Sequence, residues 1–154
     1  MNCLHVAALA LALAYGSASA AQSIEFRSDD SFFGVVAVAT AKVVVEPPFL
    51  RVTIDRGIIR ATPKTSNTKR ITGFRINLVH ALPSGSWDAV RKSERVALEE
   101  TLDHLESTAI VPRTLTIPID GIDNLRDKWL VFEIDIDGTP PGFTYSHSQK
   151  LTQE

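Results

Sequence analysis

Apolar and polar residues alternate in several segments of this chain, and a period of two predicts β-strands with one buried face. The clearest segment is 129–137, where every second residue is large and apolar: Leu130, Phe132, Ile134 and Ile136. The same alternation occurs in residues 50–55, 73–78 and 111–119. Residues 32–45 are β-branched and almost wholly apolar, which is typical of a strand covered on both faces.

Turn-forming residues predict where these strands end. Arg56-Gly57 offers a tight turn, after which residues 58–62 would pair back as the second arm of a hairpin. The polar residues 63–69 are expected to form a loop, and a last short strand is expected over 143–148.

Residues 87–106 follow a different period and predict a helix. At 100° per residue their apolar side chains fall within about a third of the helical circumference: Trp87, Val90, Leu98, Leu102 and Leu105. Ser86 is a suitable N-cap. Basic residues precede acidic ones in this segment, which opposes the helix dipole at a cost of tenths of a kcal/mol per charge. Burial of each leucine contributes about 1.5–3 kcal/mol, so packing is expected to prevail.

The order of these elements predicts the fold class. Helices do not alternate with the strands, so the sequence favours an antiparallel β-sandwich with one helix over a parallel α/β sheet. The chain has 154 residues, of which 44% are hydrophobic and 22% charged, proportions typical of one globular domain. A single sandwich domain over residues 21–154 is therefore expected.

One segment of about twenty residues resembles a corner of known sandwiches. It comprises Leu115-Thr116-Ile117-Pro118, then Ile122, Leu125 and Lys128-Trp129-Leu130-Val131-Phe132-Glu133-Ile134. This pattern is similar to the E-to-F corner of immunoglobulin-like and fibronectin-type domains, except that Trp129 stands near where those domains carry a tyrosine. The resemblance implies an immunoglobulin-like sandwich and no particular activity.

The N-terminus has the pattern of a secretory signal peptide. An apolar run over 4–15 is too short to span a bilayer, and Ala18-Ser19-Ala20 fits the small-residue rule for cleavage. A signal peptide is therefore predicted over residues 1–20, with a secreted or periplasmic mature chain. No later apolar run reaches spanning length, so no membrane span is expected in the mature chain.

Cysteine and histidine usage limits the chemistry available to the mature chain. The only cysteine is Cys3, in the leader, so thiol catalysis, iron–sulfur clusters and cysteine-ligated zinc are excluded after cleavage. His80, His104 and His147 lie in separate segments without zinc-ligand spacing. No Gly-x-Ser-x-Gly motif occurs. The sequence names no catalytic residue, and a catalytic or metal site assembled in space stays an alternative.

Calcium is the one cofactor for which the sequence offers ligands. Asp135 and Asp137 alternate on one predicted strand, and Asp123 lies in the connection before it. Their carboxylates suit calcium, although the spacing differs from that of an EF-hand loop. The competing interpretation is a solvated acidic surface.

Charge is distributed unevenly along the chain. Residues 51–75 hold seven basic residues against one acidic, whereas residues 99–137 hold ten acidic against three basic. This asymmetry admits three interpretations: attraction of an anionic partner, head-to-tail association, or attraction between the two segments inside the fold. The candidate binding residues are Arg51, Arg60, Lys64, Lys69, Arg70 and Arg75. Nucleic acid is not expected, because the ring of Phe74 points inward by parity and leaves no stacking platform.

Together these features predict a non-catalytic binding or interaction module, with an anionic envelope polysaccharide or a protein as its partner. One alternative is an extracytoplasmic inhibitor of a hydrolase that inserts the loop 63–70 into the enzyme's cleft. Another is a small hydrolase or metal-dependent enzyme.

Overall fold

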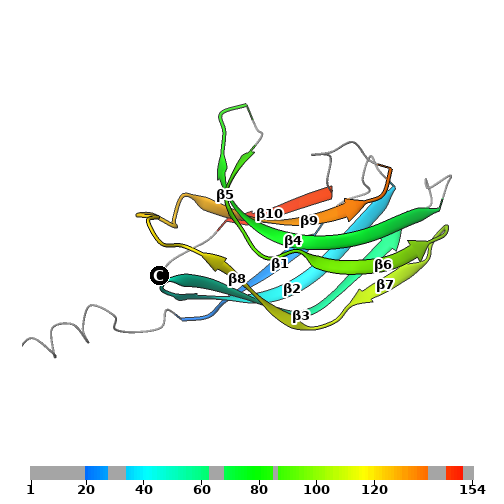
Figure 1. Ribbon diagram of the computed structural model, residues 1–154, viewed down its shortest axis with the longest axis horizontal. Coiled ribbons are helices and arrows are strands. Elements are labelled where there is room, and N and C mark those ends of the chain that lie inside the picture. The colour runs from blue at the N-terminus through cyan, green and yellow to red at the C-terminus, as the bar shows by residue number, and fades with distance from the viewer. Residues whose placement is uncertain (1–19, 28–33, 63–67, 85–86, 139–144, 151–154) are drawn as a thin grey trace, which may run out of the picture.

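In the computed structural model, two five-stranded antiparallel sheets pack face to face (Figure 1). The structure describes residues 20–27, 34–62, 68–84, 87–138 and 145–150. Sheet A comprises β1 (Gln22–Arg27), β2 (Val35–Glu46), β3 (Phe49–Ala61), β7 (Ser107–Ile110) and β8 (Arg113–Pro118). Sheet B comprises β4 (Lys69–Ala81), β5 (Trp87–Lys92), β6 (Val96–Leu102), β9 (Lys128–Ile136) and β10 (Tyr145–Lys150). The predicted antiparallel β-sandwich is confirmed.

The two sheets share one plan. In sheet A the order is β1-β2-β3, and the short strands β7 and β8 follow one another along the free edge of β3. In sheet B the order is β10-β9-β4, and β5 and β6 follow one another along β4. One edge of each sheet is thus interrupted, and short interrupted edges pair poorly with a second chain.

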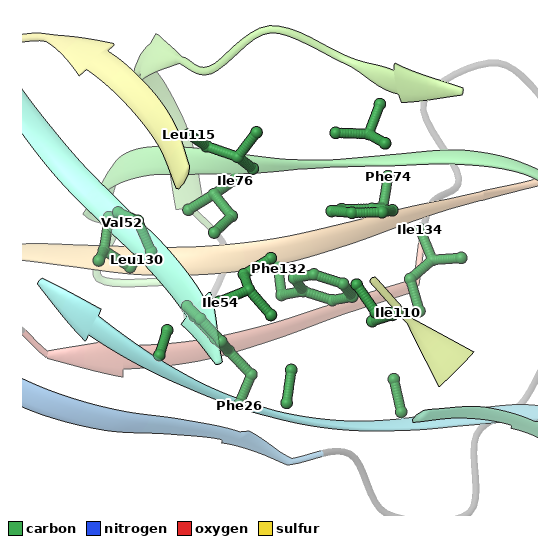
Figure 2. Close-up of a cluster of buried hydrophobic side chains, with 14 of the residues drawn as sticks. Phe26, Val52, Ile54, Phe74, Ile76, Ile110, Leu115, Leu130, Phe132 and Ile134 are labelled. Atoms are coloured by element: carbon green, nitrogen blue, oxygen red, sulfur yellow. The ribbon is translucent and has the colours of Figure 1, made fainter. Parts of the chain in front are cut away.

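Three phenylalanine rings join the sheets at the centre of the core (Figure 2). The ring of Phe132 stacks on that of Phe74 with 5.2 Å between centroids, and lies 5.7 Å from that of Phe26 on the opposite sheet. Such aromatic pairs contribute about 0.5–1.5 kcal/mol beyond their buried area. The inward positions predicted from alternation are confirmed as buried: Leu50, Val52, Ile54, Phe74, Ile76 and Leu78.

The helix predicted over residues 87–106 is wrong, because this segment forms β5, β6 and the turn into β7. The helical pattern depended on a gap from Val90 to Leu98 that no apolar residue fills on the same helical face. Val96, Leu98 and Leu102 also fit a strand, and β6 pairs with the otherwise open edge of β4. Completing the hydrogen bonds of β4 is a tertiary gain that the local spacing does not contain.

The hairpin predicted at Arg56-Gly57 is also wrong. β3 runs straight through this position, and Asp55 and Arg56 together oppose Thr40 as a β-bulge. The extra residue reverses the inward parity, so that Gly57 and Ile59 follow Ile54 into the core. In the sequence, both a bulge and a turn end one alternating apolar segment and begin another of opposite parity, so the two cannot be told apart by alternation.

The other predicted strands correspond to observed ones with shifted ends. Segment 111–119 corresponds to β8, and segment 129–137 corresponds to β9. The last strand, expected over 143–148, is β10, at 145–150. Residues 32–45 correspond to β2, but they are not covered on both faces, since Val38 on the outer face is 36% exposed.

The predicted signal peptide lies almost wholly outside the described residues. The described part of the chain contains no helix that is long and apolar enough to cross a membrane.

Candidate binding surfaces

The candidate binding residues do not form one patch, because β3 and β4 belong to different sheets. Arg51 and Arg60 lie on the outer face of sheet A, whereas Arg70 and Arg75 lie on the outer face of sheet B. Lys69 begins β4 and is half-buried. Lys64 lies outside the described residues.

On sheet B, Arg70 and Arg75 are held by carboxylates of the acidic segment. Arg75 Nε lies 3.2 Å from Glu133 Oε1, and its Nη2 lies 3.8 Å from Asp135 Oδ2. Arg70 Nη2 lies 2.8 Å from Glu99 Oε2, and the hydrogen bond to this carboxylate is the main cause that raises the pKa of Arg70. For these two arginines, the basic and acidic segments attract each other inside the fold.

Arg95, in the gap between β5 and β6, crosses β4 to reach β9. Its Nε donates to Asp135 Oδ2 at 2.5 Å, and its Nη2 donates to the carbonyl and the hydroxyl of Thr72 at 2.7 and 3.0 Å. The guanidinium can lie this close to β4 because Gly73 has no side chain, and a Cβ there would lie 2.6 Å from Arg95 Cζ. One cation thus ties β4 and β9 to the connection between β5 and β6 on this face.

The centre of the same face is buried although it lies outside the sandwich core. Val79 and Val131 are at most 1% exposed but do not belong to the core cluster. Asn77 is fully buried beside them and donates from Nδ2 to Glu133 Oε2 at 2.5 Å. The outer face of sheet B is therefore a packed surface whose arginines are already neutralised.

The outer face of sheet A has the opposite character. Arg51 pairs with Glu46, and Arg27 Nε lies 2.8 Å from Glu25 Oε1. Three further cations on this face have no carboxylate within ion-pair distance among the described residues: Lys42, Arg56 and Arg60. Within the described part of the chain, positive charge without an ion-pair partner thus gathers on sheet A.

Exposed aliphatic side chains lie between these cations. Ile58 is 48% exposed and opposes Val38, itself 36% exposed, across the β2–β3 ladder. Arg56 and Arg60 flank Ile58 on the same face, with Cα atoms about 13 Å apart at the usual rise of a strand. We call the surface of Val38, Lys42, Arg56, Ile58 and Arg60 the basic face.

The calcium candidates are not brought together as a metal site. Asp135 contacts Arg75 and Arg95, and Asp137 lies 3.5 Å from Arg70 Nη1. Asp123 is exposed in the connection between β8 and β9. Across the described part of the chain, no three His, Cys, Asp or Glu side chains group closely enough to hold an ion.

The histidines are equally dispersed. His80 Nδ1 lies 3.8 Å from Asp127 Oδ2 at the surface. His104 lies in the β6–β7 turn, and the side chain of His147 is outside the described part.

Sequence reasoning missed Arg56, Lys42 and the two exposed aliphatic residues of the basic face. The available signal was the adjacent pair Asp55-Arg56 between two alternating segments of opposite parity. Once Arg56 is placed in a bulge rather than a turn, parity puts it on the same face as Ile58 and Arg60.

Three comparisons with known proteins were negative: the chain matches no family model, no curated protein and no solved structure.

Proposed function

We propose that this protein is a non-catalytic interaction module that binds the acidic surface of a partner through its basic face. The observation that carries the proposal is the contrast between the two outer faces. Arg70, Arg75 and Arg95 on sheet B pair with carboxylates, whereas Arg56 and Arg60 on sheet A have no carboxylate partner among the described residues. Uncompensated arginines on a rigid sheet attract and orient an anionic partner.

The partner that fits this face best is a protein. Ile58 and Val38 expose aliphatic surface between the cations, and such surface gains most from contact with other apolar side chains. Sugar rings stack on aromatic platforms, and on the described strands of sheet A the exposed aromatic ring is that of Phe49, at the far end of β3 from Ile58.

We further propose that the module works outside the cytoplasm. The signal-peptide pattern over 1–20 supports this location.

The strand order supports an immunoglobulin-like type of sandwich. β3 lies between β2 and the β7–β8 edge, as strand B lies between A and E in those domains. β4 lies between β9 and the β5–β6 edge, as C lies between F and C′, and β10 takes the place of G. The departures are the added strand β1 and the lack of a D strand among the described residues.

Site-specific photo-crosslinking in the native host tests the proposed binding face. A photoreactive amino acid at Ile58 is expected to give a discrete protein adduct, and Arg56→Ser/Arg60→Ser is expected to abolish it because the attracting charge is removed. Raising the salt concentration should weaken the adduct as well. Absence of any protein adduct at Ile58 would refute the proposed face.

A matched control separates the face from net charge. Lys92→Ser/Arg126→Ser removes the same two charges from exposed positions away from the basic face. It should leave the Ile58 adduct unchanged. Equal loss in both double variants would mean that net charge, rather than this face, governs binding.

A further inference from the structure

The turn that joins β6 to β7 is held in one conformation by four hydrogen bonds. The Glu106 N–H donates to the Asp103 carbonyl at 3.0 Å, and the Asp103 N–H donates to Glu106 Oε2 at 2.8 Å. Thr68 Oγ1 donates to Asp103 Oδ1 at 2.6 Å, and the Ala61 N–H donates to the Glu106 carbonyl at 2.9 Å. Contacts with the ends of β3 and β4 therefore make this a rigid tip.

Leu105, in this tip, has a backbone conformation and an exposure that are both unfavourable for leucine in an isolated molecule. Leu105 has φ 65°, in the left-handed region where a leucine Cβ is crowded, and its side chain is 53% exposed. Glycine or asparagine normally occupies such a position. The rest of the chain covers less than half of Leu105. The side chain of Leu105 is therefore apolar, exposed and held in place, which are the properties of an interface anchor.

Acidic residues are frequent in the chain just before and after this anchor. Glu100, Asp103 and Glu106 are all exposed on β6 and in the turn. We call the surface of Glu100, Asp103, Leu105 and Glu106 the acidic tip. It has an apolar centre with negative neighbours, whereas the basic face has an apolar centre with positive neighbours. The two surfaces are complementary in both polarity and charge.

We infer that the partner of the basic face is a second copy of this chain, whose acidic tip places Leu105 against Ile58 between Arg56 and Arg60. This inference rests on the proposed function and names its partner. Pairing of two basic faces is disfavoured, because a two-fold axis would bring the uncompensated cations of both copies together.

The two surfaces are different patches that adjoin at the end of β3, where Arg60 pairs with Ser107, the residue after Glu106. A contact between the tip of one copy and the face of another is therefore heterologous. The β6–β7 turn lies at one end of the long axis, and β2 and β3 run along the side of the sandwich (Figure 1). Each copy can therefore donate its tip and accept another at the same time. A contact of this kind that does not close on itself produces open chains.

Sedimentation of the purified exported chain over a range of concentrations and salt tests this inference. The wild-type chain is expected to form species larger than dimers as concentration rises, and fewer of them as salt rises. Leu105→Asn suits the left-handed backbone and removes the anchor, and it is expected to weaken association at least about tenfold. Ile58→Ser/Arg56→Glu removes the acceptor and should have the same effect.

Mixing the two variants distinguishes head-to-tail contact from other modes. Leu105→Asn keeps an intact face, and Ile58→Ser/Arg56→Glu keeps an intact tip. Each alone should be monomeric, and the mixture should form a 1:1 dimer and nothing larger. Val111→Asn alters another exposed apolar residue, 66% exposed, and should associate like the wild type.

The outcomes separate this inference from the proposed function. A wild type that stays monomeric, variants that associate as well as the wild type, or a mixture that gives no dimer each overturn the self-association. If the Ile58 adduct then contains a different protein, the proposed function stands with another partner. If Ile58 gives no adduct either, both fail.

Discussion

At the scale of single residues, two glycines decide how closely neighbouring elements pack. Gly73 admits the Arg95 guanidinium on the outer face of sheet B, and Gly57 admits Ile110 inside the core. Neither glycine has a positive φ, so the requirement at both positions is space rather than backbone conformation. Alanine at either position would overlap with a neighbour.

The space at Gly57 can be tested with a double-mutant cycle. A Cβ there would lie 2.7 Å from Ile110 Cδ1, the atom that Ile110→Val removes. Gly57→Ala is expected to cost about 1–3 kcal/mol of unfolding free energy, and Ile110→Val about 0.5–1.5 kcal/mol. The double variant should cost clearly less than the sum of both in urea denaturation. Additive costs would show that Ile110 Cδ1 is not the limiting contact.

Asp127 offers a prediction about proton binding. A hydrogen bond from Lys128 is the first cause that holds the pKa of Asp127 below its ordinary value of 3.8, and the charge of His80 lowers it further. Because the folded pKa is depressed, the stabilisation is present above pH 3.8 and is lost as pH falls through the folded pKa. Lys128→Met should raise the pKa of Asp127, as followed by NMR titration of its carboxyl carbon. No change in this variant would contradict the assigned cause.

At the scale of elements, the interrupted edge strands need substitutes for the missing ladder bonds. Ser93, between β5 and β6, supplies them to Ile76. Its N–H donates to the Ile76 carbonyl at 2.9 Å, and its Oγ accepts from the Ile76 N–H at 3.0 Å. One buried serine thus completes the hydrogen bonding of β4 where no strand pairs with it.

Removal of the Ser93 hydroxyl should lower the free energy of unfolding by more than is usual for the loss of one small polar group. Ser93→Ala leaves the buried Ile76 N–H without an acceptor, which is expected to cost about 1–3 kcal/mol in chemical denaturation. Ser23→Ala, at an exposed position of the edge strand β1, is a serine-to-alanine control for which no comparable loss is expected. A cost below about 0.5 kcal/mol for Ser93→Ala would show that water replaces the hydroxyl.

At the scale of the whole molecule, the arginines divide into those that pair with carboxylates across strands and those without an ion pair among the described residues. Those of sheet B bridge β4, β6 and β9 through pairs with carboxylates. Those of the basic face contribute no ion pair among the described residues. Stability and binding should therefore respond to different substitutions.

This division predicts that loss of arginines from the two faces affects stability differently. Arg75→Ala leaves Glu133, a carboxylate with 9% side-chain exposure, without its cation, and is expected to lower unfolding free energy by about 1–3 kcal/mol. Arg56→Ser/Arg60→Ser should change it by less than about 0.5 kcal/mol per site, because these side chains are exposed and form no ion pair with the described residues. Thermal and urea denaturation of both variants measures the difference. Comparable destabilisation would mean that the basic face also supports the fold.

The sequence by itself determined the strands whose pattern is local. In 50–55, 73–78 and 129–137 the inward residues are large and apolar, and alternation placed them in the core because a strand's side chains alternate between faces. It also determined that the chain after residue 20 is held together without disulfides, since the only cysteine is Cys3. These features require no knowledge of which strands are neighbours.

Only the tertiary structure decided the rest. Residues 87–102 became strands because the edge of β4 required partners, and the reversed parity at Asp55-Arg56 became a bulge because β2 continues alongside. Strand pairing decided which arginines form ion pairs. Arg75 lies beside Glu133, 58 positions away in the sequence, whereas Arg56 has no carboxylate partner among the described residues. Charge compensation depends on distance in space, which local sequence does not encode.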